Sequence, residues 1–555
     1  MINFKKYNIV LLVSSVMLLF TSCDLDVESP NDLTEDETNA SLLAVGMYQA
    51  YQKVYANEYI ISELRSDNAR SESGGGDNGL ADTYSIPNNF NDGRAYWVNN
   101  YSVILNANRI LIDEEELVAQ DLDNPDRVRT SGRQALAEAY FMRALSHFNL
   151  VRAFRRVPYI DAVILNPDDI LLFDTLAFNE NFDAALQEVY TRIINDFNSS
   201  INFFNAVNDG SVVRNKANLP AAYGFLVKAL LSQPNKDFTT AFSILNTHLH
   251  PDTNVFGLEL VDVNLDDIAE GIQDYLSIFQ GNELNEEILF AVSYEGGNFN
   301  DVVNQDFNID DQVQGDAQEW SRGMSEFGQG NGLIFSSELL DNFIFVNDVA
   351  AGIIPEPIRG GDLSQLEEGN LFGNTEVFGT VIDDDGVELI TQNFTGTTGL
   401  VQERNRDYYD AKFRDTAEGS GVDGIVLRYA DILLLFSEAL AGGNDTADAV
   451  AIDMYNRVRA RVGADPLDTP FLTQQALLDE RRIELCFENQ RLWDIIRFNA
   501  DDGTNLLREF TLTPDRIQES DGFQFLTGRQ FLPIPSVEIG LTGGIDVTYT
   551  QNASY

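Results

Sequence analysis

The chain has 555 residues, of which 88 are acidic and only 36 basic, so its formal net charge is −52. Such an excess of acid excludes nucleic-acid binding, because few cations are available to neutralise phosphates, and it disfavours docking on anionic lipid head groups. An apolar content of 44% argues against disorder, and the length favours several domains or one large scaffold with long insertions. We expect no cofactor; bound calcium and a saline habitat are two interpretations of the acidic surface.

The N-terminus has the pattern of a bacterial lipoprotein signal peptide. Lys5 and Lys6 precede an uncharged apolar stretch, residues 9–20, which is shorter than the roughly 20 residues that a spanning helix needs. Small residues stand just before Cys23, as a peptidase that cuts before a lipid-modified cysteine requires. An ordinary signal peptide with a chance cysteine is the alternative, disfavoured because Cys486 is the only other cysteine. We predict a signal peptide over 1–22, lipidation of Cys23 and a flexible acidic tether over 23–38.

Apolar residues spaced three and four apart predict a series of amphipathic helices in the next part of the chain, over 42–56, 97–112, 134–154, 188–204, 221–231 and 238–249. Short connectors pair these helices, with small and aromatic residues on the contact faces. Stacked helical hairpins bury surface that one hairpin cannot. Residues 39–260 are therefore predicted to form a helical-repeat scaffold.

Glycine, asparagine and aspartate become frequent over 261–420, and helical periodicity fades there except near 334–345. We expect a loop-rich insertion with a few short helices and strands. Regular structure resumes with predicted helices over 426–440, 449–462 and 473–498. Residues 421–555 would complete the scaffold and end in a loop-rich tail, with Cys486 as a small buried residue.

Four segments, in this order behind a lipoprotein signal, resemble the SusD/RagB family of outer-membrane nutrient-binding lipoproteins of Bacteroidetes. They are EAYFMRA (138–144) with RRVP (155–158), LRYADILL (427–434) with EA (438–439), ERRIEL (480–485) with FE (487–488), Arg491 and Asp494, and LPIP (532–535). The resemblance implies a mainly α fold with four tetratricopeptide-like helical pairs. It also implies a non-enzymatic protein that is lipid-anchored to the outer face of the outer membrane, captures glycans or peptides, and partners a SusC-like TonB-dependent transporter.

The charged run over 480–497 could be taken for a catalytic cluster, but its spacing favours a structural role. Three oppositely charged pairs stand three residues apart, as in pairs that brace a helix: Arg481 and Glu484, Glu488 and Arg491, and Asp494 and Arg497. We give Arg428, Asp431 and Glu438 the same interpretation.

No motif for a chemical reaction stands out. The many carboxylates single out no pair for glycoside hydrolysis, and the chain has neither a nucleophile elbow nor a phosphate-binding loop. His248 and His250 lack a third ligand at a recognisable spacing, so we predict no metal site. The run 383–386 (DDDG) lacks the ligand pattern of an EF-hand, and a tight turn is favoured over weak calcium binding.

Glycan recognition needs flat aromatic faces and fixed polar groups, which loops on a rigid scaffold commonly supply. Two polar, glycine-rich segments qualify: residues 65–94, with Asp67, Asn68 and Tyr84, and residues 294–335, with Phe299 and Trp320. Trp320 is the strongest single candidate, with packing of the insertion onto the scaffold as its equal alternative. The tryptophans at 97 and 493 lie in periodic helices and are expected in the core. Glycan capture is the favoured function, peptide capture is second, and surface glycoside hydrolysis is third.

Overall fold

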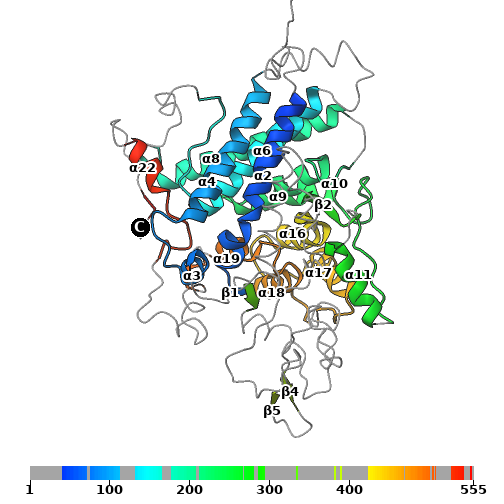
Figure 1. Cartoon of the computed structure of the whole chain (residues 1–555). Helices are drawn as coiled ribbons and strands as arrows, with labels where there is room; N and C mark the ends of the chain where they lie inside the picture. The colour runs from blue at the N-terminus through cyan, green and yellow to red at the C-terminus, as the bar shows by residue number, and fades with distance from the viewer. Residues whose placement is uncertain are drawn as a thin grey trace, which may run out of the picture.

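The computed structural model in Figure 1 describes residues 40–71, 76–112, 132–164, 177–207, 212–266, 268–280, 285–293, 333–335, 380–382, 388–390, 423–467, 469–499, 503–505, 507, 527–542, 551–552 and 555. The predicted signal peptide, the tether and Cys23 lie outside these residues, and so do Phe299 and Trp320.

The described part of the chain is mainly helical, as predicted. Its helices are α2 (Ala40–Ala56), α3 (Gly76–Asp82), α4 (Asn91–Leu111), α6 (Gly132–Phe154), α7 (Ala177–Glu180), α8 (Phe182–Val207), α9 (Leu219–Ser232), α10 (Phe238–His248), α11 (Ile268–Gln280), α16 (Tyr429–Ala441), α17 (Ala449–Arg461), α18 (Gln474–Glu484), α19 (Arg491–Phe498) and α22 (Ser536–Thr542), with a π-helical turn η2 (Tyr59–Glu63). The strands are β1 (Ala69–Ser71), β2 (Ile288–Val292), β3 (Leu333–Phe335), β4 (Thr380–Ile382), β5 (Glu388–Ile390) and β6 (Gly424–Arg428).

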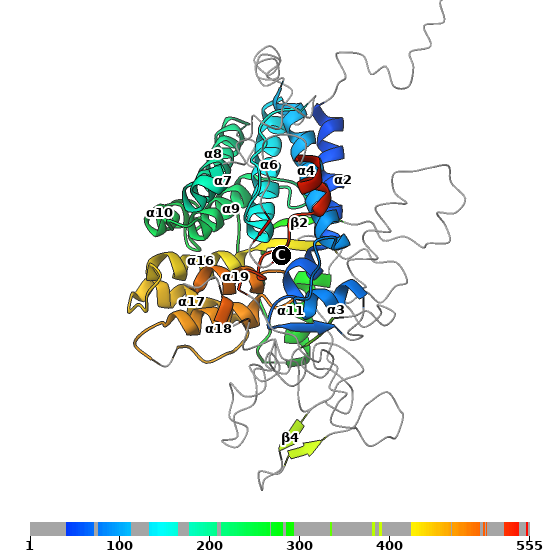
Figure 2. The ribbon, with the colours of Figure 1, turned by 90° about the vertical axis from the view of Figure 1, so that its left-hand side faces the viewer.

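The long helices pack in chain order, each against the next. Contacts join α2 to α4, α4 to α6, α6 to α8, α8 to α9, α9 to α10, α10 to α16 and α16 to α17. Figure 2 shows two tiers: an N-terminal tier of α2, α4 and α6 to α10, and a C-terminal tier of α16 to α19 that continues the stack below it. This confirms the predicted helical-pair scaffold.

Helix α6 is the centre of the N-terminal tier, because its residues are buried on nearly every side. The ring of Phe141 makes edge-to-face contacts with rings from three other elements: Phe197 at 5.8 Å between centroids, Phe225 at 5.7 Å and Phe290 at 5.3 Å. Edge-to-face pairs add to the stabilisation that burial of the rings already gives. These contacts pack α6, α8, α9 and β2 into one continuous core.

The apolar run predicted as a helix over 426–440 is a strand followed by a helix. Residues up to Arg428 belong to β6, and α16 starts at Tyr429. The run is buried in both elements, so neither half shows the polar face that would distinguish a strand from a helix. The other long prediction, 473–498, is two helices, because Phe487 and Asn489 adopt the left-handed conformation with φ of 60° each. A right-handed helix cannot continue through such residues.

Two predictions about loops are also corrected. The segment 65–94 contains β1, α3 and the start of α4, and α11 lies where the periodicity was weak. Near 334–345, where periodicity suggested a helix, the described residues Leu333–Phe335 form a strand. Among the helices the structure describes, none is both long and apolar enough to cross a bilayer.

Candidate functional site

Two pairs of strands hold the ends of the stretch 293–423, and the two segments predicted to bind a glycan, at the helical scaffold. Strand β2 pairs antiparallel with β6, so that Val292 lies opposite Gly424 at the two ends of the stretch 293–423. Strand β1 pairs antiparallel with β3, so that Ser71 lies opposite Leu333. The stretch 294–332 therefore ends where β3 begins, beside β1. Both segments predicted to bind a glycan meet at one small sheet, shown in Figure 1 at the lower edge of the scaffold.

Side chains of α2 fasten the β2–β6 pair to the N-terminal tier. The Tyr55 hydroxyl donates to the carbonyl of Ile425 at 2.9 Å, and the Gln52 amide donates to the carbonyl of Ser293 at 2.8 Å. Gly424 packs so closely on the Tyr55 ring that a Cβ at this position would collide with it. The stretch 293–423 therefore starts and ends at a fixed point of the core.

Asp67 and Asn68, predicted as loop residues that contact a ligand, are buried instead. The guanidinium of Arg491 binds both carboxylate oxygens of Asp67, at 2.6 and 2.8 Å, and Arg482 lies 3.5 Å away. The Asn68 amide donates to Glu63 at 2.7 Å and accepts from Arg482 at 3.0 Å. Burial alone would raise the pKa of Asp67, but the two arginines outweigh it and hold that pKa well below its usual range.

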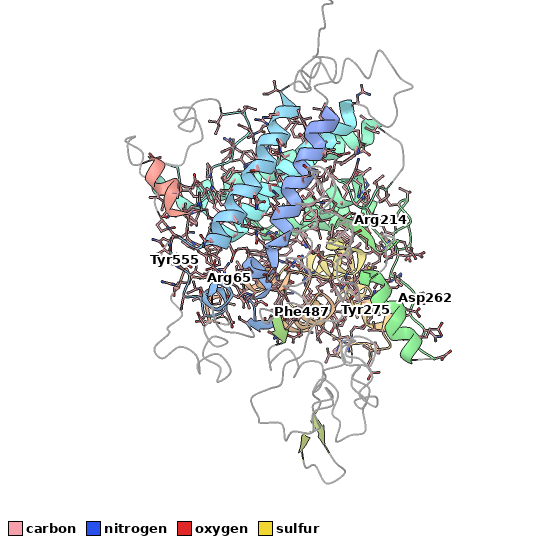
Figure 3. The ribbon with its side chains drawn as sticks, viewed as in Figure 1. Arg65, Arg214, Asp262, Tyr275, Phe487 and Tyr555 are labelled. Carbon is pink, nitrogen blue, oxygen red and sulfur yellow. The ribbon has the colours of Figure 1, made fainter. Side chains whose placement is uncertain are left out.

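Tyr84 is fully buried as well. It has a left-handed backbone, with φ of 55°, and its hydroxyl donates to the carbonyl of Arg65. Arg65 is labelled in Figure 3. Its guanidinium lies 5.4 Å from the centre of the Tyr84 ring and donates to the carbonyl of Gln530 at 2.8 Å. A polymer in solution cannot reach a side chain that is 0% exposed. The prediction that Asp67, Asn68 and Tyr84 form an accessible glycan site is therefore wrong: they build the base on which β1 rests.

A buried ionic network continues from this base through the C-terminal tier. Arg428 is only 1% exposed and donates to three carboxylates, with both oxygens of Glu488 at 2.6 and 2.8 Å, Glu484 at 2.6 Å and Glu287 at 2.7 Å. Arg461 binds the same Glu287 at 2.7 Å and also contacts Glu484. The network joins β6, α17 and α18 to the segment just before β2.

A second group of buried charges joins α9, α16, α18 and α19. Asp431 accepts from Lys228 at 2.6 Å and lies 2.8 Å from Arg481, which in turn donates to Asp494 at 2.8 Å. Arg497 pairs with Glu438 and with Asp494. Burial would raise the pKa of Asp431 and of Asp494, but the neighbouring cations outweigh it and hold both below the usual range.

The structural role predicted for these charged residues is confirmed, but most of the ion pairs predicted for them are wrong. Of the three pairs predicted to brace a helix, Asp494 and Arg497 do pair, at 2.8 Å. The partners of Arg481, Glu484, Glu488 and Arg491 instead come from other elements. The neighbouring cations hold the pKa of Asp67, Asp431 and Asp494 low, so these three carboxylates are poor proton donors near neutral pH and suit support rather than acid catalysis.

The other residues named in the sequence analysis make ordinary packing contacts. Trp97 and Trp493 are buried, as predicted, and so is the free Cys486. The ring of His248 stacks on Tyr223 at 4.1 Å. Among the residues placed in the structure, no three His, Cys, Asp or Glu side chains are grouped as a metal ion requires. Local sequence gave no signal that Arg482 and Arg491 would bury the segment around Asp67, because these residues are more than 400 positions apart.

Comparisons with known proteins agree over nearly the whole chain. Residues 25–231 match the family described as "Starch-binding associating with outer membrane", and residues 379–555 match the SusD family. SusD-like protein P2 of Formosa agariphila is 24% identical, over 96% of this chain and 97% of that protein. A SusD-like protein of Bacteroides ovatus is 23% identical, over 80% of this chain and 76% of that protein.

Solved structures share the fold. A laminarin-binding SusD-like protein superposes with a TM-score of 0.59 at 22% identity, and the match covers 94% of this chain and 99% of the other. A SusD-like protein of Bacteroides fragilis superposes with a TM-score of 0.60 at 19% identity, covering 96% and 99%. The two-tier helical scaffold, the family matches and the full-length relatives lead to one conclusion: the chain belongs to the SusD/RagB family.

Proposed function

We propose that this protein is a non-catalytic, lipid-anchored lipoprotein on the outer face of the outer membrane. It binds a polysaccharide or oligosaccharide and delivers it to a SusC-like TonB-dependent transporter. The observation that carries the proposal is the β1–β3 pair, since it brings the end of the stretch 294–332 to the scaffold edge beside β1. Family membership, with one matching family described as starch-binding, supports a glycan as the ligand.

We assign the aromatic contacts to Trp320 and Phe299, within the stretch that ends at this sheet. Flat rings bind the apolar faces of sugars, while a rigid base keeps the loop ends in place. That base includes the buried residues Asp67, Asn68 and Tyr84, which are not among the proposed ligand contacts. The affinity of a single site for the glycan is modest. Several copies of the protein, each anchored to the same membrane through Cys23, can bind one long polymer together and so raise the overall affinity.

The test uses residues 24–555 in calorimetry against a panel that includes starch, laminarin and peptides. We expect binding to at least one glycan, no binding to peptides, and no release of reducing sugar over a long incubation. Trp320→Ala should weaken glycan binding by about tenfold or more, since anchoring aromatics commonly contribute about 2 kcal/mol. Phe471→Ala is the matched control, because Phe471 is 53% exposed and lies on the connection between α17 and α18.

Two results would contradict the proposal: a panel on which peptides bind and glycans do not, or product release from any polysaccharide. The anchor is tested separately in cells. Cys23→Ser should move the protein from the outer-membrane fraction to the soluble fraction, and the wild-type protein on intact cells should be accessible to added protease. Retention of Cys23→Ser in the membrane fraction would argue against the lipid anchor.

A further inference from the structure

Helix α6 buries a carboxyl group whose contacts are all with neutral donors. Glu138 is 5% exposed, and its oxygens accept from the Tyr48 hydroxyl of α2 at 2.9 Å and from the Gln134 amide at 2.7 Å. Within the described part of the chain, no cation lies in ion-pair contact with this carboxyl. A buried carboxylate without a cationic partner commonly takes up a proton instead of keeping its charge.

Burial governs the ionisation of Glu138. It raises the pKa of this carboxyl above its ordinary value near 4.5, and the hydrogen bonds from Gln134 and Tyr48 and the positive charge of Lys216 lower that pKa only in part. Lys216 acts from the surface, where it belongs to the connection 212–218 before α9. Neutral Glu138 is therefore favoured over a wider pH range than an exposed glutamate.

The other helices packed on α6 bring no further charge to Glu138 among the described residues. Asp196 of α8 pairs with Arg143 at 2.7 Å, and Lys228 of α9 pairs with Asp431 at 2.6 Å. The described residues of α2 and α4 bury no charged side chain. The proton on Glu138 is thus controlled by its burial and by the three groups already named.

The Tyr48 hydroxyl joins Glu138 to the connection 212–218. While this hydroxyl donates to Glu138, it accepts from the backbone N–H of Ala217 at 2.9 Å. The connection lies at the surface, where Val213 is 46% exposed. Water therefore reaches the buried carboxyl when this short segment moves outward, which breaks the hydrogen bond between Ala217 and Tyr48.

The same connection holds β2. Asn218 donates to the carbonyl of Leu289 at 2.8 Å, and the carbonyl of Arg214, which Figure 3 labels, accepts from the N–H of Ala291 at 2.9 Å. Strand β2 pairs with β6 and leads into the stretch 293–423. Outward movement of the connection therefore loosens the strand from which that stretch starts.

We propose that proton binding at Glu138 regulates how firmly the connection 212–218 holds β2. With the proton bound, the carboxyl stays buried and the connection stays in the closed position that the structure shows. Once the proton is lost, the carboxylate gains hydration when the connection moves outward, so the open position becomes more populated. The effect on ligand binding rests on the proposed function, because β2 leads into the stretch to which we assigned the ligand contacts.

The direction of this effect follows from the linkage between proton binding and opening. Because burial raises the pKa of Glu138 in the closed position, that position binds the proton more tightly than the open, hydrated one. Closing is therefore favoured fully below about pH 4.5, and the preference is lost as the pH rises through the pKa of the closed position. If the pKa values of the two positions differ by one, the opening equilibrium changes about tenfold.

The test measures hydrogen exchange of residues 24–555 by mass spectrometry at pH 5 and pH 8, corrected for the chemical exchange rate at each pH. In the wild type, peptides covering 212–218 and β2 should lose about tenfold or more of their protection at pH 8. Glu138→Gln keeps the size of the side chain but cannot ionise, so the protection of these peptides should not depend on pH. Glu188→Gln is the matched control and should behave like the wild type, because Glu188 is an exposed carboxylate of α8 paired with Arg192.

The wild-type measurement keeps the test decisive if Glu138→Gln does not fold. A second variant, Tyr48→Phe, removes the hydroxyl that holds Ala217, so protection of 212–218 should be low at both pH values. Equal wild-type protection at pH 5 and pH 8 would overturn the proposal. So would a folded Glu138→Gln that keeps the wild-type pH dependence, or a loss of protection spread evenly over α6, α8 and α9.

Ligand binding is measured separately, so that its failure and that of the proton switch are distinguishable. A glycan that binds the wild type should bind about threefold or more tightly at pH 5 than at pH 8, and equally at both values to Glu138→Gln, because the closed position is the binding-competent one. Binding that does not depend on pH, beside exchange that does, would overturn the regulation of the ligand site. Absence of any glycan binding would contradict the proposed function alone, since the exchange experiment needs no ligand.

Discussion

Replacing Arg428 by methionine should destabilise the protein more than any surface change. The side chain is 1% exposed and makes five hydrogen bonds, four to carboxylate oxygens and one to the carbonyl of Glu484 at 2.6 Å. Burial alone would lower the pKa of Arg428, but the carboxylates of Glu488 and Glu484 outweigh it and raise that pKa, so the side chain is charged. Methionine fills a similar length without the charge.

The size of this loss of stability depends on which ion pairs each carboxylate keeps after Arg428 is replaced. Glu287 and Glu484 still contact Arg461, whereas Glu488 loses both bonds of its bidentate pair. Removing one partner of a buried ion pair commonly costs about 3–5 kcal/mol. We expect that loss for Arg428→Met, and a smaller loss for the double variant Arg428→Met with Glu488→Gln, because the double variant leaves one fewer buried negative charge.

The assay is urea unfolding followed by circular dichroism, comparing transition midpoints at equal slope. Arg457→Met serves as control, because this arginine is 37% exposed and its pairs with Asp252 and Asp453 lie at the surface. An exposed pair contributes about 0–1 kcal/mol. A loss below about 1 kcal/mol for Arg428→Met, or a loss equal to that of Arg457→Met, would refute the reasoning.

Three further predictions concern single residues. The neutral His147 ring donates to one backbone carbonyl and accepts from one backbone N–H, and burial lowers its pKa to about 3. The contribution of neutral His147 to the free energy of unfolding is therefore complete above about pH 6.5 and falls as the pH drops toward 3. In urea unfolding between pH 7 and pH 5, the wild type should lose about 2 kcal/mol more of that free energy than His147→Gln. Gly424→Ala should cost about 1–3 kcal/mol because its Cβ would collide with Tyr55, whereas Gly46→Ala, with 3.7 Å to its nearest neighbour, should stabilise α2 by about 0.5–1 kcal/mol in thermal melts. Asn218→Ala removes the cap of α9 and a 2.8 Å bond to β2, and should lower the urea midpoint by the equivalent of about 1–2 kcal/mol; an unchanged midpoint would argue against the cap.

The sequence was sufficient for the parts of the fold that rest on local periodicity. The helix over 134–154 was found to within two residues, because its apolar residues recur with helical spacing. The boundary between β6 and α16 was missed because Val426 and Leu434 belong to one mainly apolar stretch that is buried on nearly all sides, so it shows no polar face that would distinguish a strand from a helix.

The candidate site was harder to predict, because burial of polar side chains depends on distant partners. Asp67 and Asn68 have the composition of a surface loop, and only Arg482 and Arg491 make them part of the core. Buried charges in proteins are paired, and Asp67 follows this rule. The spacing of residues along the sequence, however, does not reveal which distant residue is the partner. Family resemblance, in contrast, correctly indicated the overall architecture.

The pairing of Val292 with Gly424 has an evolutionary consequence. A segment whose two ends are joined by a strand pair can be lengthened, shortened or exchanged while the scaffold stays closed. Doubling the length of such a closed segment costs only about 0.6 kcal/mol of chain entropy. Natural selection, or an engineer grafting a segment from a relative, could therefore replace the stretch 293–423 as a unit, and with it the loop that we propose as the ligand contact. The rest of the molecule would keep its core.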